Sequence, residues 1–319
     1  MSKALVFPGQ GSQAPGMGKA LADGFSYARQ VFAEVDDALG EKLSRLIFEG
    51  PLDELTLTAN AQPALFAASL AVIRVLEKEA GLELSRDIRF VAGHSLGEYS
   101  ALAAAGAFSV AEGAKLLRVR GRAMQEAVPV GSGAMAALLG LDCAAAAAIS
   151  AEAASPGKGE VCEVANDNGG GQVVVSGSSA AVARATEIAK ARGARRSVLL
   201  PVSAPFHCTL MQPAADAMAA ALAAVAIASP CVPVVSNVLA APVTDPEEIR
   251  KLLVAQVTRL VRWRESAAYM ASQGVSCFVE CGSGKVLSGL IKRIVPEARS
   301  VSIGSPENLA LYKETVESS

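Results

Sequence analysis

A serine and two histidines are the side chains of this sequence best suited to nucleophilic chemistry. Ser95 lies in Gly93-His94-Ser95-Leu96-Gly97, which follows an apolar run at 88–92 and precedes an alanine-rich helical pattern. A serine on such a strand-turn-helix segment exposes its Oγ at a helix N-terminus, where free N–H groups can stabilise charge on a carbonyl oxygen. The flanking glycines leave room for the tight turn. The pattern predicts a nucleophile elbow, although a glycine-rich loop can match five residues by chance.

A serine nucleophile needs a base, and the chain contains only His94 and His207. His94 directly precedes Ser95, and adjacent residues at the end of an extended strand point to opposite faces. His207 lies far away in the sequence, as the partners of a catalytic serine usually do. We therefore expect His207 to be the base. No Asp or Glu is placed by spacing to orient its imidazole, and a backbone carbonyl could serve instead.

The elements around these residues predict an α/β fold. Lys3–Phe7 reads as a short buried strand, and the loop 8–13 that follows it contains two glycines and the amides of Gln10 and Gln13. Further strands are expected at 88–92, 233–238 and 277–280, the last being the final clear strand. Helices are expected in two stretches over 19–46 and at 61–80, 97–105, 110–128, 211–226 and 246–257.

The helix that follows Ser109 carries an arginine on its apolar face. Ser109 and Glu112 form a capping-box pattern, and the core stripe contains Arg120 among apolar residues, whereas Arg118 and Arg122 fall roughly 200° away on the helical wheel. A buried guanidinium needs an anion, because an unpaired buried charge is costly. From the residues alone, a structural ion pair or a side chain reaching the surface is the favoured interpretation.

Residues 129–202 have a different character and predict a small inserted domain. The pattern is strand (134–139), helix (144–154), strand (161–166), strand (172–176), helix (180–192) and strand (197–202), with a glycine-rich hairpin turn at 168–171. That βαββαβ order is typical of a ferredoxin-like unit. We therefore expect a discontinuous large domain of residues 1–128 and 203–319, resembling an α/β-hydrolase with a parallel central sheet.

The composition limits the possible functions. Of 319 residues, 51% are hydrophobic and 19% charged, and the net charge of −2 argues against a nucleic-acid ligand. Six dispersed cysteines without a Cys-x-x-Cys pair suggest neither a disulfide framework nor a metal site. No long apolar run or signal peptide is evident, so we expect a cytoplasmic protein that does not enter a membrane. The basic clusters 192–196 and 262–264 are either solvated helix ends or contacts for an acidic partner.

A set of motifs spread over the whole chain resembles the malonyl-CoA:acyl carrier protein transacylases. The elbow at 93–99 and the loop 7–13 match this family. So do, in family order, Gln62-Pro63-Ala64, Arg120-Gly121, Gly133-Ala134-Met135-Ala136, His207-Cys208 and Gly284-Lys285-Val286-Leu287. Three positions depart from common family patterns. Leu260 occupies a position where the family often has proline, and Ser283 replaces the proline of a common Gly-Pro-Gly sequence. Phe206 precedes His207 where small residues also occur, and could narrow the acyl pocket.

The resemblance implies an enzyme, an acyl-carrier-protein S-malonyltransferase of fatty acid biosynthesis. In it, Ser95 takes the malonyl group from malonyl-CoA with His207 as base, and the phosphopantetheine thiol of holo acyl carrier protein then accepts it. No cofactor would be bound, since coenzyme A arrives as substrate and the carrier supplies phosphopantetheine. We expect a monomer.

The resemblance also implies the remaining site residues. The backbone N–H groups of Gln10 and Leu96 would form the oxyanion hole, and the Gln256 carbonyl would orient the imidazole of His207. Arg120 would pair with the malonyl carboxylate, in place of the structural ion pair. Three alternatives remain: an acyltransferase for a polyketide synthase carrier, a serine hydrolase, and a carrier-binding module without catalysis.

Overall fold

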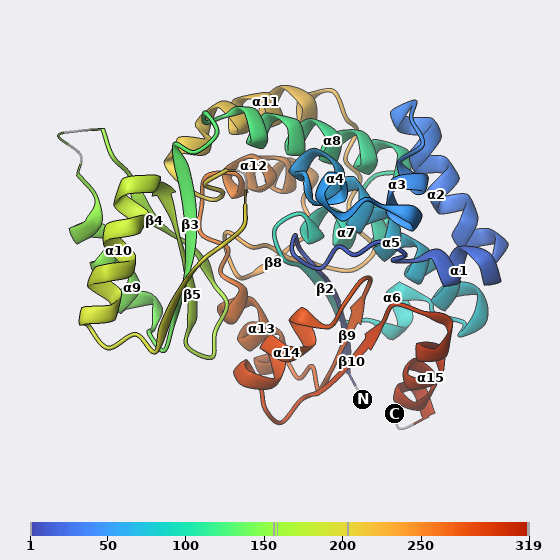
Figure 1. Cartoon of the computed structure of the whole chain (residues 1–319). Coiled ribbons are helices and arrows are strands. Elements are labelled where there is room, and N and C mark those ends of the chain that lie inside the picture. Colours follow the sequence, from blue (N-terminus) through green and yellow to red (C-terminus); the bar gives the residue numbers. More distant parts are fainter. Residues whose placement is uncertain (1, 156, 158, 203, 318–319) are drawn as a thin grey trace.

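The larger of two β-sheets forms the centre of the molecule (Figure 1). The computed structural model describes residues 2–155, 157, 159–202 and 204–317. The strand order is β10-β9-β1-β2-β7-β8, and every pair is parallel except β7 with β8. The bounds are β1 Lys3–Phe7, β2 Phe90–Gly93, β7 Val234–Val235, β8 Pro242–Val243, β9 Cys277–Cys281 and β10 Arg299–Ile303. The predicted α/β fold with a mostly parallel central sheet is therefore confirmed.

Helices cover this sheet on both sides. They are α1 Lys19–Gly24, α2 Ser26–Leu39, α3 Leu43–Glu49, α4 Leu52–Thr56, α5 Thr58–Glu79, α6 Leu84–Asp87, α7 Gly97–Ala104, α8 Val110–Glu126, α11 Gln212–Ala223, α12 Pro246–Gln256, α13 Trp263–Ser272, α14 Val286–Ile294 and α15 Leu309–Glu317, with short 3₁₀ turns at Thr209–Met211 and Pro306–Asn308. Helix α5 is long and apolar enough to cross a membrane, but 83% of its most apolar window is buried inside the fold. It packs against α8 and α2 as a core helix does.

The register of the central strands brings the predicted functional loops together. Phe7 at the end of β1 lies opposite Gly93 at the end of β2, and Ala92 lies opposite Val235 of β7. Because parallel strands end at the same edge of a sheet, the loops after β1, β2 and β7 all open on one side. That edge carries the site.

The second sheet has four antiparallel strands in the order β4-β5-β3-β6. Its elements run β3 Gly133–Leu139, α9 Cys143–Ala153, β4 Cys162–Asp167, β5 Gln172–Ser178, α10 Ser179–Ala191 and β6 Arg196–Leu199. Alanine and valine side chains of α9, α10 and the strands form a separate apolar cluster, which includes Ala146, Ala185 and Val175. The predicted element order and the turn at 168–171 are confirmed.

Several predicted boundaries differ from the structure. The strand expected at 277–280 is not the final one, since β10 follows it in the sequence. Arg299–Ile303 lies at the edge of the sheet and alternates polar and apolar residues, a pattern weaker than that of a buried strand. The strand expected over 233–238 is reduced to β7, and the residues after it form a turn. The region 19–46 holds three helices instead of two, and α5 begins at Thr58, before Pro63. The expected boundary at residue 203 lies outside the described residues.

Candidate active site

Ser95 lies on a strained turn between β2 and α7. Its φ of 53° is in the left-handed region, which non-glycine residues rarely adopt. A methyl group on Gly93 would come within 1.9 Å of the Gly97 carbonyl, and one on Gly97 within 2.2 Å of the Phe7 carbonyl oxygen. Both glycines are thus required by close backbone contact. The predicted nucleophile elbow is confirmed in its geometry.

His207 reaches Ser95 from the loop between β6 and the turn at Thr209–Met211. The Ser95 Oγ lies 2.8 Å from His207 Nε2, and His207 Nδ1 lies 2.8 Å from the carbonyl oxygen of Gln256. A carbonyl can only accept, so the proton resides on Nδ1 and leaves Nε2 free to accept from the serine hydroxyl. The structure therefore places Ser95, His207 and Gln256 in the predicted order.

The environment keeps this imidazole neutral. His207 is 4% exposed, and its pKa is lowered to about 3, first by burial and then by the positive charge of Arg120. The neutral ring is the form that can take a proton. Cys208, the next residue, is a poor competitor as a nucleophile because burial raises the pKa of its thiol to about 11.

Arg120 points from α8 into the site and is 1% exposed. Its Nη2 donates to Ser95 Oγ at 3.1 Å and to Gln256 Oε1 at 3.0 Å, and its Nη1 donates to Gln62 Oε1 at 2.8 Å. The guanidinium lies over the Tyr99 ring, 5.7 Å from its centroid. None of these hydrogen-bond acceptors is a carboxylate, so Arg120 forms no ion pair of the expected structural kind with any residue that the structure describes.

Arg118 is buried, although it falls roughly 200° from the core stripe on the helical wheel. Arg118 is only 8% exposed, and it donates to the Ala59 carbonyl, to Asn60 Oδ1 and to Glu41. The N-terminal end of α5 packs over α8 and covers the side that a single amphipathic helix would expose. The capping box of Ser109 and Glu112 is confirmed.

His94 has a structural environment distinct from that of His207. Its Nε2 lies 2.8 Å from Asn168 Oδ1 in the β4–β5 turn, and its ring lies 5.7 Å from the ring of Trp263, which is fully buried. No hydrogen bond joins His94 to the Ser95 hydroxyl among the described residues. His94 thus links the elbow to the second sheet.

Gln10 and Leu96, the residues expected to supply the oxyanion hole, line the same pocket. Within the described chain, neither the Gln10 nor the Leu96 N–H has a protein acceptor, and both residues line the pocket that contains Ser95. The Gln10 side chain is held by a 3.2 Å hydrogen bond to Thr58 Oγ1. An oxyanion role for these two donors stays a prediction.

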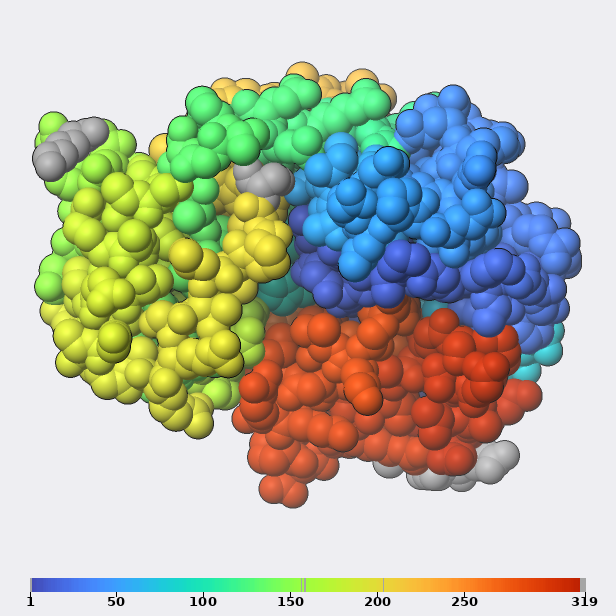
Figure 2. Space-filling view, viewed as in Figure 1, coloured from blue at the N-terminus to red at the C-terminus, as the bar shows by residue number. Residues whose placement is uncertain are grey.

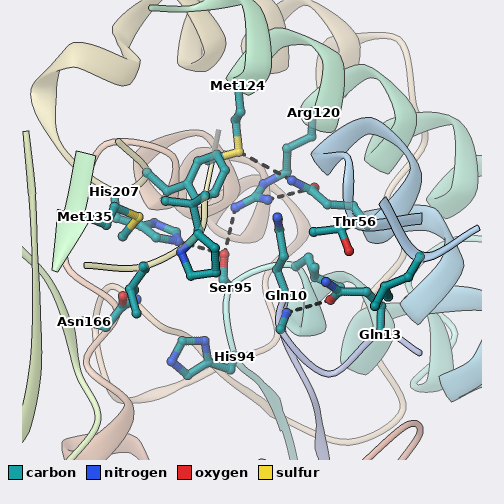
Figure 3. A pocket seen from close by; sticks show the side chains of 18 residues that line it. Gln10, Gln13, Thr56, His94, Ser95, Arg120, Met124, Met135, Asn166 and His207 are labelled. Atoms are coloured by element: carbon teal, nitrogen blue, oxygen red, sulfur yellow. Dashed lines mark hydrogen bonds between the residues drawn. The ribbon is translucent and has the colours of Figure 1, made fainter. Parts of the chain in front are cut away.

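The pocket lies between the two sheets and encloses about 430 Å³. Figure 2 shows a depression between the residues that follow β6 and those around α4. In the close view, Ser95 lies between Arg120, His207 and Gln10, with His94 below (Figure 3). The lining also contains Gln13, Leu52, Thr56, Gln62, Met124, Met135, Asn166, Leu200 to Val202 and Phe206. Phe206 therefore does border the expected acyl space.

Sequence reasoning missed the polar residues behind the elbow. Asn237 Oδ1 accepts the Ser95 N–H at 2.7 Å, and its Nδ2 donates to the Gly93 carbonyl at 2.7 Å. The Gln256 side chain donates to the Ser95 carbonyl at 3.1 Å, in addition to its backbone role. Only its position after a buried strand at the active edge could have singled out Asn237. Among the described residues, no group of three or more His, Cys, Asp or Glu is arranged to hold a metal ion.

Comparison with known proteins identifies the class to which this fold and site belong. The acyl transferase domain family matches residues 4–304, and the chain belongs to that family.

Within the family, the relatives have a more particular name. The chain is 45% identical over 317 residues to the malonyl CoA-acyl carrier protein transacylase of Bacillus subtilis strain 168, covering 99% of this chain and 98% of that protein. The crystal structure of an acyl-carrier-protein S-malonyltransferase from Bartonella henselae matches with a TM-score of 0.96 and 55% identity, covering 99% of this chain and 100% of the other. A malonyl-transacylase solved in complex with a type II polyketide synthase acyl-carrier protein matches with a TM-score of 0.94, 42% identity and coverage of 99% and 100%.

Proposed function

We propose that this protein transfers the malonyl group from malonyl-CoA to the phosphopantetheine thiol of an acyl carrier protein. The observation that carries the proposal is the buried Arg120, whose Nη2 lies 3.1 Å from Ser95 Oγ. A cation next to the nucleophile suits an acyl group that ends in a carboxylate. The names of the relatives, at 45% and 55% identity, support the same function.

In the first half-reaction, Ser95 Oγ attacks the thioester carbonyl carbon while His207 Nε2 takes the hydroxyl proton. The N–H groups of Gln10 and Leu96 stabilise the charge on the carbonyl oxygen. Collapse of the tetrahedral intermediate breaks the C–S bond, and the imidazolium returns its proton to the leaving sulfur. The products are coenzyme A and an O-malonyl-serine.

In the second half-reaction, the carrier thiol replaces coenzyme A. His207 takes the thiol proton, the sulfur attacks the serine ester, and Ser95 Oγ leaves with the proton from His207. The reaction needs no bound cofactor, since the acyl donor and the carrier bring their own thiols. We expect the enzyme to act as a cytoplasmic monomer.

The guanidinium group of Arg120 is the proposed binding partner, or clamp, of the malonyl carboxylate. Its planar donors can hold a carboxylate with two parallel charge-assisted hydrogen bonds, and in a pocket shielded from water that pair is strong. An acetyl group offers no such partner. The clamp therefore supplies the discrimination between malonyl and acetyl groups.

The proposal extends to the domain organisation. The strand order β4-β5-β3-β6 supports a ferredoxin-like assignment for residues 129–202, inserted into a large α/β-hydrolase-like domain. The pocket would then lie at the junction of the two domains.

A polyketide carrier is the second candidate acceptor, favoured by the neighbour solved with such a protein. A serine hydrolase is disfavoured, because the usual acid that orients its histidine is replaced here by the Gln256 carbonyl. Rates of malonyl transfer to carriers of the two pathways decide between the acceptors.

The test is intact mass after brief exposure to malonyl-CoA. We expect one malonyl adduct on the peptide that contains Ser95, and its loss when holo carrier protein is added. Ser95→Ala should abolish the adduct, and His207→Ala should slow its formation by about 10²–10⁴-fold. Adduct formation on a cysteine, or hydrolysis faster than transfer, would contradict the proposal.

A further inference from the structure

Glu98 is a buried acidic residue that takes no direct part in the proposed reaction. It lies near the start of α7, is 3% exposed, and accepts two hydrogen bonds at Oε2. One comes from the Asn237 backbone N–H at 3.0 Å and the other from Gln256 Nε2 at 2.8 Å. Burying a carboxyl group is costly unless it is hydrogen-bonded. Both of its donors belong to residues that also hold Ser95.

Glu98 and Arg120 together determine the orientation of the Gln256 amide. Nε2 of this amide faces Glu98, while Oε1 accepts from Arg120 Nη2 at 3.0 Å. The reverse orientation would place an NH₂ group against a guanidinium, which has only donors, and an oxygen against a carboxyl oxygen. A single orientation therefore satisfies both neighbours.

The position of Arg120 depends on that amide. Two glutamine oxygens, Gln62 Oε1 and Gln256 Oε1, hold the two ends of its guanidinium, and its Nε has no hydrogen-bond partner within the described chain. If the Gln256 oxygen were turned away, Nη2 would keep only the Ser95 hydroxyl. The Gln256 oxygen is therefore one of the two acceptors that hold the guanidinium in place beside Ser95.

We propose that Glu98 is a positioning residue for acyl-group selection. By fixing the Gln256 amide, it holds the Arg120 guanidinium where a carboxylate on the substrate can pair with it. Through the Asn237 N–H, the same carboxyl group fixes the loop that supports the elbow. One buried side chain thus positions both the arginine that selects the acyl group and the turn that carries Ser95. This inference rests on the proposed function.

The test compares the ratio of kcat/KM values for malonyl-CoA and acetyl-CoA in the full-length protein. Glu98→Met keeps the approximate size of the side chain but removes the oxygen that accepts from Gln256 Nε2, so that Glu98 no longer constrains the orientation of the amide. We expect the malonyl-to-acetyl ratio to fall on the order of tenfold, as for residues coupled through one network. Glu98→Gln, whose amide oxygen can accept from both donors of the carboxyl group, should retain more of the ratio than Glu98→Met.

The matched control is Glu280→Met. Glu280 is also fully buried, but it accepts the backbone N–H groups of Leu287 and Ser288 at the start of α14, away from the pocket. We expect this control to lower the melting temperature and leave the ratio unchanged.

If Glu98→Met does not fold, Gln256→Met tests the same link, because it removes the amide and should lower the ratio as well. Where both fold, the double variant should lower the ratio no further than the larger single effect. An unchanged ratio in the folded variants, or additive effects in the double variant, would overturn the role of Glu98. Absence of malonyl transfer by the unmodified protein would instead refute the proposed function.

Discussion

At the scale of single residues, the protonation of His207 has a consequence for pH dependence. Its pKa is lowered to about 3, mainly by burial, so the base remains neutral far below the ordinary histidine value of about 6.5. We therefore expect loss of the His207 base to produce no acid limb in kcat/KM for acylation by malonyl-CoA above about pH 5. Burial raises the pKa of Glu98 to about 7, so the profile is compared with that of Glu98→Gln, which has no carboxyl group to titrate. Stopped reactions analysed by intact mass measure this, and an acid limb with its midpoint near 6.5 in both proteins would contradict it.

The same group affects stability in a defined direction. Unfolded His207 takes up a proton as the pH falls through about 6.5, whereas the folded protein does so only near 3. Its contribution to the free energy of unfolding is therefore lost on acidification between these values. Circular dichroism at each pH separates loss of fold from loss of the base.

Arg120 allows a sharp prediction on specificity. Arg120→Ala should reduce kcat/KM for malonyl-CoA by on the order of 10²-fold, because a buried charge-assisted pair is lost, while transfer of acetyl is retained or increased. Arg120→Lys should restore only part of the malonyl rate, since an ammonium cannot form the planar fork. Melting temperatures serve as the control. Equal loss for both substrates would indicate a purely structural arginine.

Short sequence patterns predicted the features that depend on residues close together in the sequence. Ser95 and the capped start of α8 followed from spacing alone, and the roles of Gln10, Leu96, Arg120 and Gln256 were expected from family resemblance. Burial of Arg118 and the contacts of Asn237 with Ser95 and Gly93 could not be predicted, because they join residues 58 or more positions apart. For Gln256 the sequence indicated only the backbone carbonyl. Its side chain bonds Arg120, so Gln256→Ala should be more damaging than a carbonyl role alone implies.

At the scale of elements, the β2–α7 turn is held by backbone contact. Gly97→Ala would place a methyl group 2.2 Å from the Phe7 carbonyl oxygen, so β1 and α7 would have to separate. We expect a loss of stability on the order of 3 kcal/mol and no detectable acylation. Gly289→Ala is the control, since nothing lies near that position within α14, and it should stabilise by about 0.5–1 kcal/mol. Thermal unfolding and intact mass measure both, and an active, stable Gly97→Ala would contradict the packing argument.

At the scale of the whole molecule, the distribution of charge concerns the carrier protein. The net charge is −2, and many of the clustered arginines are paired: Arg192 with Glu152, Arg262 with Glu265 and Arg264 with Asp167. Arg196, exposed at the start of β6, has no ion pair within the described residues. A partner with acidic surface would meet such an unpaired charge first.

We therefore expect KM for an acidic carrier protein to rise between about 0.05 and 0.5 M salt, with a smaller change for malonyl-CoA. Arg196→Gln should reduce this salt dependence, and Arg192→Gln should alter it less because that charge is already paired. Steady-state kinetics at several salt concentrations give the answer. A flat response for the carrier would indicate that the contact is mainly apolar.

The ring contact between His94 and Trp263 has an optical consequence. The sequence contains one tryptophan and four tyrosines, so selective excitation of tryptophan gives emission from a single indole, which lies fully buried beside the residue that precedes Ser95. The indole is thus an intrinsic fluorophore built next to the reaction centre. We expect disruption of the elbow to change its emission intensity and wavelength, which can be recorded without attaching a dye to the protein.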